Sequence, residues 1–180
     1  FLDITFLEGG DAYNTVMPSL VCRVKKSAER RTWLEAHARA WLTVTEEDDA
    51  LRLDVRGVAA HAGHPQDGES AFFRLCELMS GCEALCAADR ELLSQAARAL
   101  SDTDGTAMGL AQSDPTLGDL TAANGIVRLR EGRLMFTLDI RHGESVTGEQ
   151  LMTCLARFFL PDKIIDIYNL FSCIGNAVPN

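Results

Sequence analysis

The sequence predicts an α+β fold, in which an antiparallel β-sheet carries helices mainly on one face. Some segments alternate apolar and polar residues, as in strands with one wet face, and others carry apolar residues at helical spacing. The two kinds of segment interleave along the chain, and Glu131-Gly132 is a tight hairpin signal between two of the alternating segments. This order is close to a ferredoxin-like β-α-β-β-α-β plan with insertions.

Alternation of apolar and polar residues predicts five strands. They are residues 2–7, 20–24, 51–58, 120–130 and 133–140. In the third, Leu51, Leu53 and Val55 would share one face of the strand. Because the apolar face of each strand needs a core, we expect the segments 51–58, 120–130 and 133–140 to lie in one antiparallel sheet.

Helical spacing of apolar residues predicts four helices, at residues 28–42, 69–79, 87–100 and 148–159. Ser27 and Thr147 stand where the N-caps of the first and last helices would lie. Residues 101–118 are rich in Asp, Thr, Gly and Pro, so we expect a loop with at most a short edge strand. The acidic run 46–49 is expected to be a solvated turn.

Composition narrows the class of protein. The chain has 180 residues, of which 47% are hydrophobic, and its mean hydropathy is near zero, as in soluble globular proteins. The net charge is −9 and the 17 Lys and Arg residues are scattered, so no nucleic-acid partner is expected. No apolar run approaches the ~18 residues of a membrane span, and no secretory signal is visible, so we expect no membrane partner and a cytoplasmic location. The six cysteines contain no C-x-x-C pair, and we expect buried reduced thiols.

Three short segments place hydrogen-bonding or charged side chains at the ends of predicted strands. Residues 9–16 read G-G-D-A-Y-N-T-V, residues 57–65 read G-V-A-A-H-A-G-H-P, and residues 137–142 read T-L-D-I-R-H. Such positions beside strand ends often carry function.

In this order the segments resemble the lid domain of the di-metal metallopeptidase and amidohydrolase family of aminoacylase, carboxypeptidase G, carnosinase and the PepV-like dipeptidases. That lid, of the dimerisation type, contains G-G-x-x-x-N-x-V-P, then G-x-x-A-H-(A/G)-x-x-P-x-x-G-x-N-A, then a strand that ends in D-I-R. Here residues 68–71 read G-E-S-A after His61, and residues 139–141 read D-I-R. The segment 14–18 has one residue more than the family's spacing before its proline.

The resemblance implies a role for each matched residue. His61 resembles the catalytic lid histidine that donates a hydrogen bond to the carbonyl oxygen of the scissile amide and to the oxyanion formed from it. Asn14 resembles a second, substrate-binding donor near that oxygen. Arg141 resembles the arginine that binds the substrate carboxylate in two parallel hydrogen bonds. Ordinary roles stay open as well, namely a loop histidine, a turn cap, and an arginine paired with Asp139.

The family's two metal ions are held outside the lid, by a His-x-Asp pair, a bridging Asp, a Glu-Glu pair and a distant His. This chain contains no such set, and a pair made by His61 and His64 lacks a nearby third ligand, so no metal residue and no cofactor is expected in the chain. The resemblance implies two zinc ions, or similar divalent metals, in a separate catalytic domain. We therefore expect the isolated chain to be inactive.

The resemblance also implies that residues 1–160 form the substrate-capping lid, and that residues 161–180 are a tail or the start of the return into the catalytic domain. The implied partners are a dipeptide or N-acyl amino acid substrate, the protein's own catalytic domain and, as an option, a second copy in a homodimer. The alternative is a stand-alone α+β ligand-binding or dimerisation module without catalytic activity, and the fold by itself does not choose between them. Convergence of Asn14, His61 and Arg141 on one surface would favour the lid.

Overall fold

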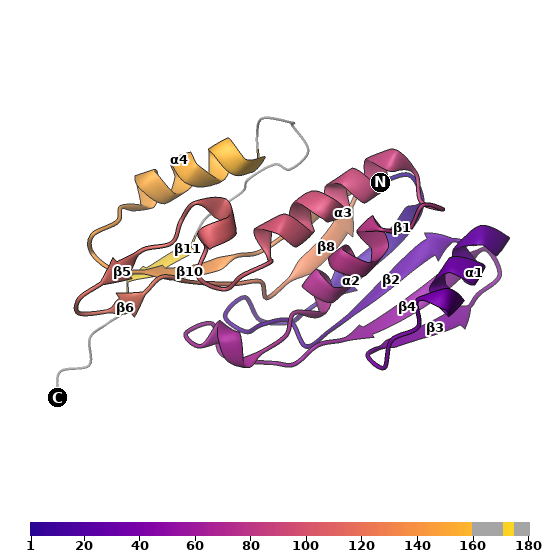
Figure 1. The fold of residues 1–180 in the computed structure, drawn as a ribbon, viewed down its shortest axis with the longest axis horizontal. Helices are drawn as coiled ribbons and strands as arrows, with labels where there is room; N and C mark the ends of the chain where they lie inside the picture. Colours follow the sequence, from indigo (N-terminus) through magenta and orange to yellow (C-terminus); the bar gives the residue numbers. More distant parts are fainter. Residues whose placement is uncertain (160–170, 175–180) are drawn as a thin grey trace.

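The computed structural model describes residues 1–159 and 171–174, and it shows the expected α+β fold (Figure 1). The large sheet contains β1 (Ile4–Gly9), β2 (Ser19–Lys25), β3 (Leu42–Glu46), β4 (Ala50–Arg56), β8 (Val127–Arg130) and β9 (Arg133–Phe136). A second sheet contains β7 (Thr121–Ala123), β10 (Asp139–His142) and β11 (Phe171–Ile174), and β5 (Ser113–Asp114) pairs with β6 (Gly118–Asp119). The helices are α1 (Ala28–Ala36), α2 (Ala71–Ser80), α3 (Ala87–Ala99) and α4 (Gly148–Phe159), with short 3₁₀ turns η1 (Pro65–Asp67) and η2 (Thr106–Met108).

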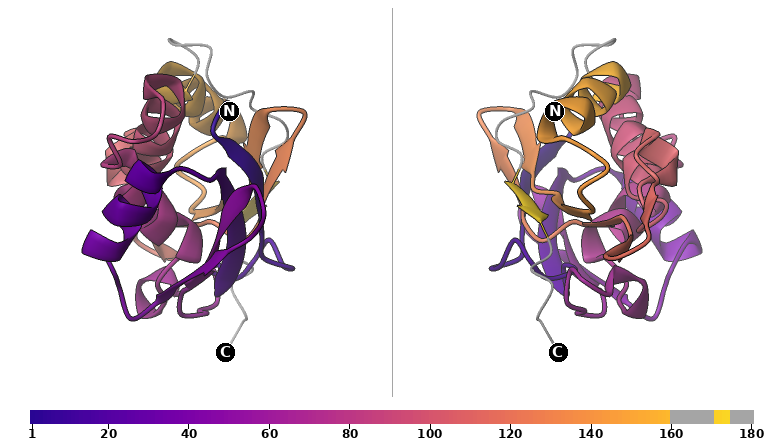
Figure 2. Two further views of the ribbon diagram at one scale, coloured as in Figure 1. Left: turned by 90° about the vertical axis from the view of Figure 1, so that its right-hand side faces the viewer. Right: turned by 90° about the vertical axis from the view of Figure 1, so that its left-hand side faces the viewer.

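The large sheet is antiparallel throughout, in the order β3-β4-β2-β1-β8-β9. Helices α1, α2 and α3 lie on one face of it, as expected (Figure 2). The run β2-α1-β3-β4-α2 follows the ferredoxin-like plan. The last strand of that plan should lie beside β2 on the side away from β4, but β1, which precedes the run in the chain, occupies this place. The ferredoxin-like plan is therefore not reproduced in detail.

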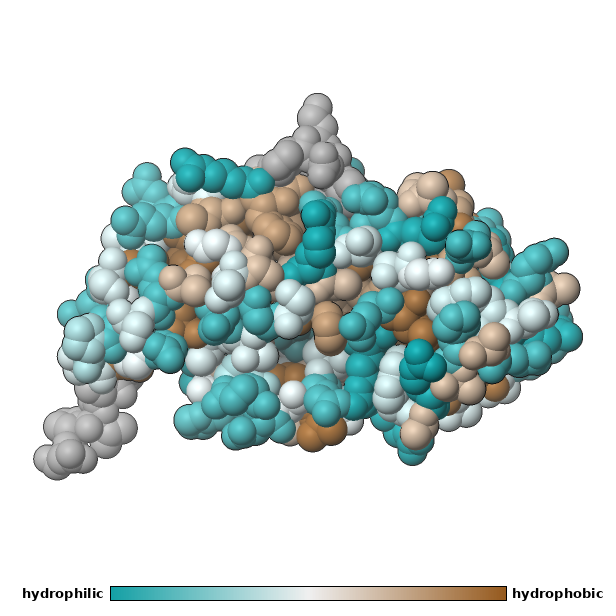
Figure 3. All heavy atoms as spheres, in the orientation of Figure 1, coloured by the Kyte–Doolittle hydropathy of each residue, from teal (hydrophilic) through white to brown (hydrophobic). Residues whose placement is uncertain are grey.

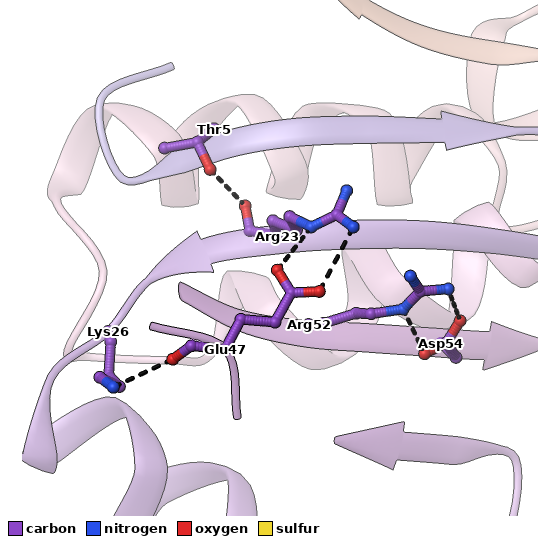
Figure 4. A network of polar contacts seen from close by, with 6 residues as sticks. All are labelled: Thr5, Arg23, Lys26, Glu47, Arg52 and Asp54. Atoms are coloured by element: carbon purple, nitrogen blue, oxygen red, sulfur yellow. Dashed lines mark hydrogen bonds and ion pairs between the residues drawn. The ribbon is translucent and has the colours of Figure 1, made fainter. Parts of the chain in front are cut away.

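Alternation decides which face of the sheet is buried. Leu51, Leu53 and Val55 of β4 are at most 1% exposed and pack under the helices, in the cluster that also contains Phe72 and Leu75 of α2. The opposite face carries charged side chains that pair with one another (Figure 4).

On that outer face the Arg23 Nε lies 2.7 Å from Glu47 Oε2, and Arg52 donates two hydrogen bonds of 2.8 Å to Asp54 (Figure 4). These side chains are about a third exposed, so each pair contributes little to stability. Because these charged side chains pair with one another and remain partly exposed, this face of the sheet is a solvated surface.

Three expected element boundaries were wrong. The helix expected at 28–42 ends at Ala36, and Leu42–Glu46 form β3, an edge strand with three consecutive β-branched residues. The strand expected at 120–130 is split into β7 and β8, and the one at 133–140 into β9 and β10. Only β8 and β9 join β4 in the large sheet, whereas β7 and β10 belong to the second sheet.

The expected loop 101–118 does contain only short elements, namely η2, the small strand β5 and the first residue of β6. The acidic run 46–49 lies at the β3–β4 turn, with Glu46 still in the strand. Of the segment 161–180, the described part is β11, which pairs in parallel with β10, and the rest lies outside the described residues.

A second apolar cluster lies under α4 and includes Ile140, Leu151 and Leu155. Phe136 joins the two clusters, because its ring centroid lies 5.6 Å from that of Phe72 and 6.0 Å from that of Phe159. On the surface, hydrophilic side chains cover most of the face seen in Figure 3, with apolar ones scattered between them. None of the helices in the described part of the chain has the length and apolar character that a bilayer crossing needs.

Asp89 in the first turn of α3 holds the start of the chain in place. Its buried carboxylate accepts hydrogen bonds from the backbone N–H groups of Leu2 (2.8 Å), Asp3 (2.8 Å) and Ile4 (2.9 Å). Burial acts to raise the pKa of Asp89, but these backbone hydrogen bonds outweigh it and leave the pKa below its usual 3.8. The ionised form is therefore the one that stabilises the fold.

Replacing this carboxylate is predicted to destabilise the protein. Asp89→Asn should lower the free energy of unfolding at pH 7 by about 2–3 kcal/mol, because hydrogen bonds to a charged acceptor are lost. Since the folded-state pKa of Asp89 is lowered, the difference in the free energy of unfolding between wild type and variant should persist down to about pH 4 and shrink below that pH. Urea unfolding at several pH values measures this. Asp48→Asn, an exposed change in the β3–β4 turn, is the control and should stay within about 0.5 kcal/mol of wild type.

Candidate functional site

Two of the three motif segments lie side by side. Asn14 lies in the loop between β1 and β2, and His61 lies in the loop between β4 and η1. An isolated antiparallel bridge pairs Thr15 with His61, and the Ala62 N–H donates to the Asn14 carbonyl at 2.9 Å. The main chain thus brings Asn14 alongside His61.

The third motif reaches the same place through the second sheet. Thr121 of β7 lies opposite Arg141 of β10 in the antiparallel register. The Thr121 hydroxyl donates to the Ala62 carbonyl at 2.9 Å, which ties the His61 loop to this pair of strands.

Gly63 marks where the side chains of His61 and Arg141 meet. A β-carbon built on Gly63 would lie 3.1 Å from His61 Nδ1 and 3.3 Å from Arg141 Nη1. The imidazole and the guanidinium therefore both lie next to Gly63. The structure brings the side chains of His61 and Arg141 to Gly63, and it brings the main chain of Asn14 next to the His61 loop.

The His61 ring is exposed, and its Nδ1 lies 3.1 Å from the backbone N of Gly63. An N–H donor pointing at Nδ1 requires that nitrogen to be an acceptor. In the neutral imidazole the proton then resides on Nε2, an assignment made from the hydrogen bond. His61 thus offers an Nε2–H donor.

Arg141 has its side chain 30% exposed and lies beside a buried acid. Its Nη2 is 3.6 Å from Asp139 Oδ2, and the Asp139 side chain is only 2% exposed. Among the described residues, neither oxygen of Asp139 accepts a hydrogen bond. The ion pair weighed from the sequence is present, but at this distance it leaves the exposed edge of the guanidinium open to a further carboxylate.

Sequence reasoning did not assign roles to Thr121 and Gly63, which contact these groups. Neither residue type signals a site by itself, and the contacts join positions far apart in the chain, since Thr121 is 59 residues from Ala62 and Gly63 is 78 residues from Arg141. The Asp139–Arg141 pair has a local signal, since residues i and i+2 of a strand share a face.

A cleft among the described residues lies elsewhere. It has a volume of about 430 Å³ and runs between α2, the segment around Trp41, and residues 100–103 and 122–124. Arg74 lies over the Trp41 ring at 5.5 Å and pairs with Glu69, so its charge is already compensated. His61 and Arg141 do not line this cleft.

One group of possible metal ligands occurs among the described residues, made by Asp3, Cys86 and Asp89. Its carboxylates are already in use, because Asp89 accepts three backbone hydrogen bonds while Asp3 accepts from Cys86 N at 2.7 Å and pairs with Arg30 at 2.7 Å. These contacts identify it as a structural cluster that fastens the start of α3. The exposed His64 belongs to no such group in the part of the chain that is described.

A comparison of the chain with protein-family models finds no match, and a comparison with curated proteins finds none either. The resemblance to the metallopeptidases therefore stays with the three motifs and their order. Function is argued below from the site itself.

The isolated chain is predicted to bind no zinc or manganese stoichiometrically and to hydrolyse no dipeptide. The physical reason is that His61 and His64 have no third ligand beside them among residues 1–159 and 171–174, and that the acids of the Asp3 cluster are occupied. Metal analysis after dialysis, together with a dipeptide hydrolysis assay, measures this. One tightly bound ion per chain, lost in a His61→Ala/His64→Ala double variant, would contradict it.

Proposed function

We propose that this chain is the substrate-capping lid of a zinc-dependent dipeptidase or amidohydrolase. The observation that supports it is the meeting of His61 and Arg141 around Gly63, with Asn14 alongside. These residues come from three separate segments, and ordinary loop or capping roles would not require them to share a surface.

The two side chains suit the two ends of a small amide substrate. The Nε2–H of His61 donates to the carbonyl oxygen of the scissile amide, and the bond strengthens as negative charge builds on that oxygen. The exposed edge of the Arg141 guanidinium binds the carboxylate of a dipeptide or N-acyl amino acid. Asn14 supplies a second donor near the carbonyl oxygen.

In this proposal the rest of the chemistry belongs to a separate catalytic domain. His61 and Arg141 are both donors, so they stabilise negative charge but generate no nucleophile. Two zinc ions or similar divalent metals in that domain would activate the attacking water. Because His61 is exposed and the Arg141 side chain is partly exposed, closure against a second domain would also exclude bulk water. The proposal keeps the cytoplasmic location and leaves homodimer formation as an option.

The main test is His61→Ala in a protein that joins this chain to its catalytic domain. We expect kcat to fall about 100-fold or more with unchanged metal content, since loss of an oxyanion donor costs ~2.7 to 4 kcal/mol in the transition state. Steady-state kinetics and metal analysis measure both quantities. His64→Ala, three residues away and also exposed, is the control and should keep near-normal turnover. Normal turnover of His61→Ala, or loss of metal, would count against the oxyanion role.

Arg141→Ala should behave differently. The carboxylate contact is present in both the ground state and the transition state, so its loss should raise KM at least as much as it lowers kcat. The control is Arg130→Ala, which removes an exposed arginine on the outer face of the large sheet that pairs with Glu8. Equal kinetics for the two arginine variants would refute a carboxylate-binding role and favour a stand-alone ligand-binding or dimerisation module.

A further inference from the structure

Gly63 lies in a tight turn that contacts both functional side chains. The His64 N–H donates to the His61 carbonyl at 2.8 Å, which closes a four-residue turn with Ala62 and Gly63 at its centre. Within this turn the Gly63 N–H points back at the ring of His61. The backbone thus interacts directly with the imidazole that it carries.

This contact has a chemical consequence. A neutral imidazole carries one proton, and a donor already bound at Nδ1 leaves Nε2 as the only place for it. The opposite tautomer would set the Nδ1–H against the Gly63 N–H at 3.1 Å and lose the hydrogen bond. The turn therefore selects the form of His61 that presents a donor at Nε2.

The absence of a side chain at residue 63 has a second consequence. A β-carbon there would lie 3.1 Å from His61 Nδ1 and 3.3 Å from Arg141 Nη1, closer than ordinary van der Waals contact. Both neighbours are ends of flexible side chains, so they would move apart by a few tenths of an ångström. An added methyl group would change the spacing of the two donors and leave the backbone amide in place.

We propose that Gly63 is the positioning residue of this site: its amide holds His61 as the Nε2–H tautomer, and its lack of a side chain sets the spacing between His61 and Arg141. The use of that Nε2–H group as an oxyanion donor rests on the proposed function. The tautomer itself does not, because it follows from a contact within this chain.

The tautomer can be measured directly on the ¹⁵N-labelled chain. At pH about 8.5, where an ordinary imidazole is neutral, the nitrogen chemical shifts of His61 report which nitrogen carries the proton. His64 is an internal control, since its exposed ring makes no hydrogen bond to the described residues. We expect the ratio of the Nε2–H form to the Nδ1–H form to be roughly 2- to 10-fold higher for His61 than for His64, which is the effect of one ordinary hydrogen bond. A scalar coupling between Gly63 N and His61 Nδ1 is also expected.

Two changes at residue 63 separate the two parts of the proposal. Replacing the Gly63 amide by an ester, through semisynthesis, removes the N–H and should return the His61 tautomer ratio to that of His64. Gly63→Ala keeps the N–H, so it should keep the tautomer while raising KM in the enzyme joined to its catalytic domain.

The outcomes distinguish this proposal from the proposed function. A tautomer ratio of His61 within about twofold of that of His64, or a dominant Nδ1–H form of His61, would overturn the role of Gly63 even if His61→Ala lowered kcat. An unchanged KM in Gly63→Ala would overturn the spacing role. A strong Nε2–H preference that disappears in the ester supports the role of Gly63 even if His61→Ala kept normal turnover, in which case only the proposed function would fail.

Discussion

The candidate site depends on buried hydrogen bonds at the place where the chain passes between the large sheet and the second sheet, here called the crossing. Asn124 follows β7, is 3% exposed, and its amide group donates to the carbonyls of Ile126 (3.2 Å) and Thr137 (2.8 Å). The Thr137 hydroxyl accepts from Ile126 N at 3.0 Å, and the Thr137 N–H donates to the Ile126 carbonyl at 2.9 Å. These bonds satisfy the backbone where two strands leave the large sheet and enter the second one. The pairing of β8 with β9 continues as the pairing of β7 with β10 after a shift of one residue, and this register places Arg141 opposite Thr121 beside the His61 loop.

The crossing also marks the limit of what the sequence predicts. Alternation placed β4 and the β8–β9 hairpin well, because a one-residue slip would expose every apolar side chain of a strand. Residues 134–140 alternate through 137–138 without a break, so that strand gives no sign of the change of sheet, whereas Asn124-Gly125 and the apolar pair Ile126-Val127 do interrupt the pattern on the other strand. The predicted first helix is too long for a similar reason. Trp41 continues the helical spacing of Trp33 and Leu34, although Leu42–Glu46 pair with β4. Local periodicity carries no information on which distant strand provides the hydrogen bonds.

The candidate site residues were selected by their motifs, but the sequence did not predict their arrangement. His61 and Arg141 are 80 positions apart, and they meet because Thr121 bonds to Ala62 and pairs with Arg141 across two strands. Those are long-range contacts between residue types that are common in any sheet. Asp139 is different, because its position two residues before Arg141 on one strand face already predicts a pair, and the structure adds that this acid is buried and the arginine is not.

That difference in burial has an electrostatic consequence for Arg141. A buried carboxylate without other partners is costly unless a cation stays near it, so Asp139 favours the conformations in which the guanidinium remains at this place. The separation of 3.6 Å is longer than a hydrogen bond, and the guanidinium keeps donors free for a second acid. The interaction of those donors with a substrate carboxylate would strengthen as water is removed, because charges attract more strongly at low dielectric constant. A partly exposed site of this kind would therefore gain affinity when another surface closes over it, which is a physical argument for the proposed lid function over independent ligand binding.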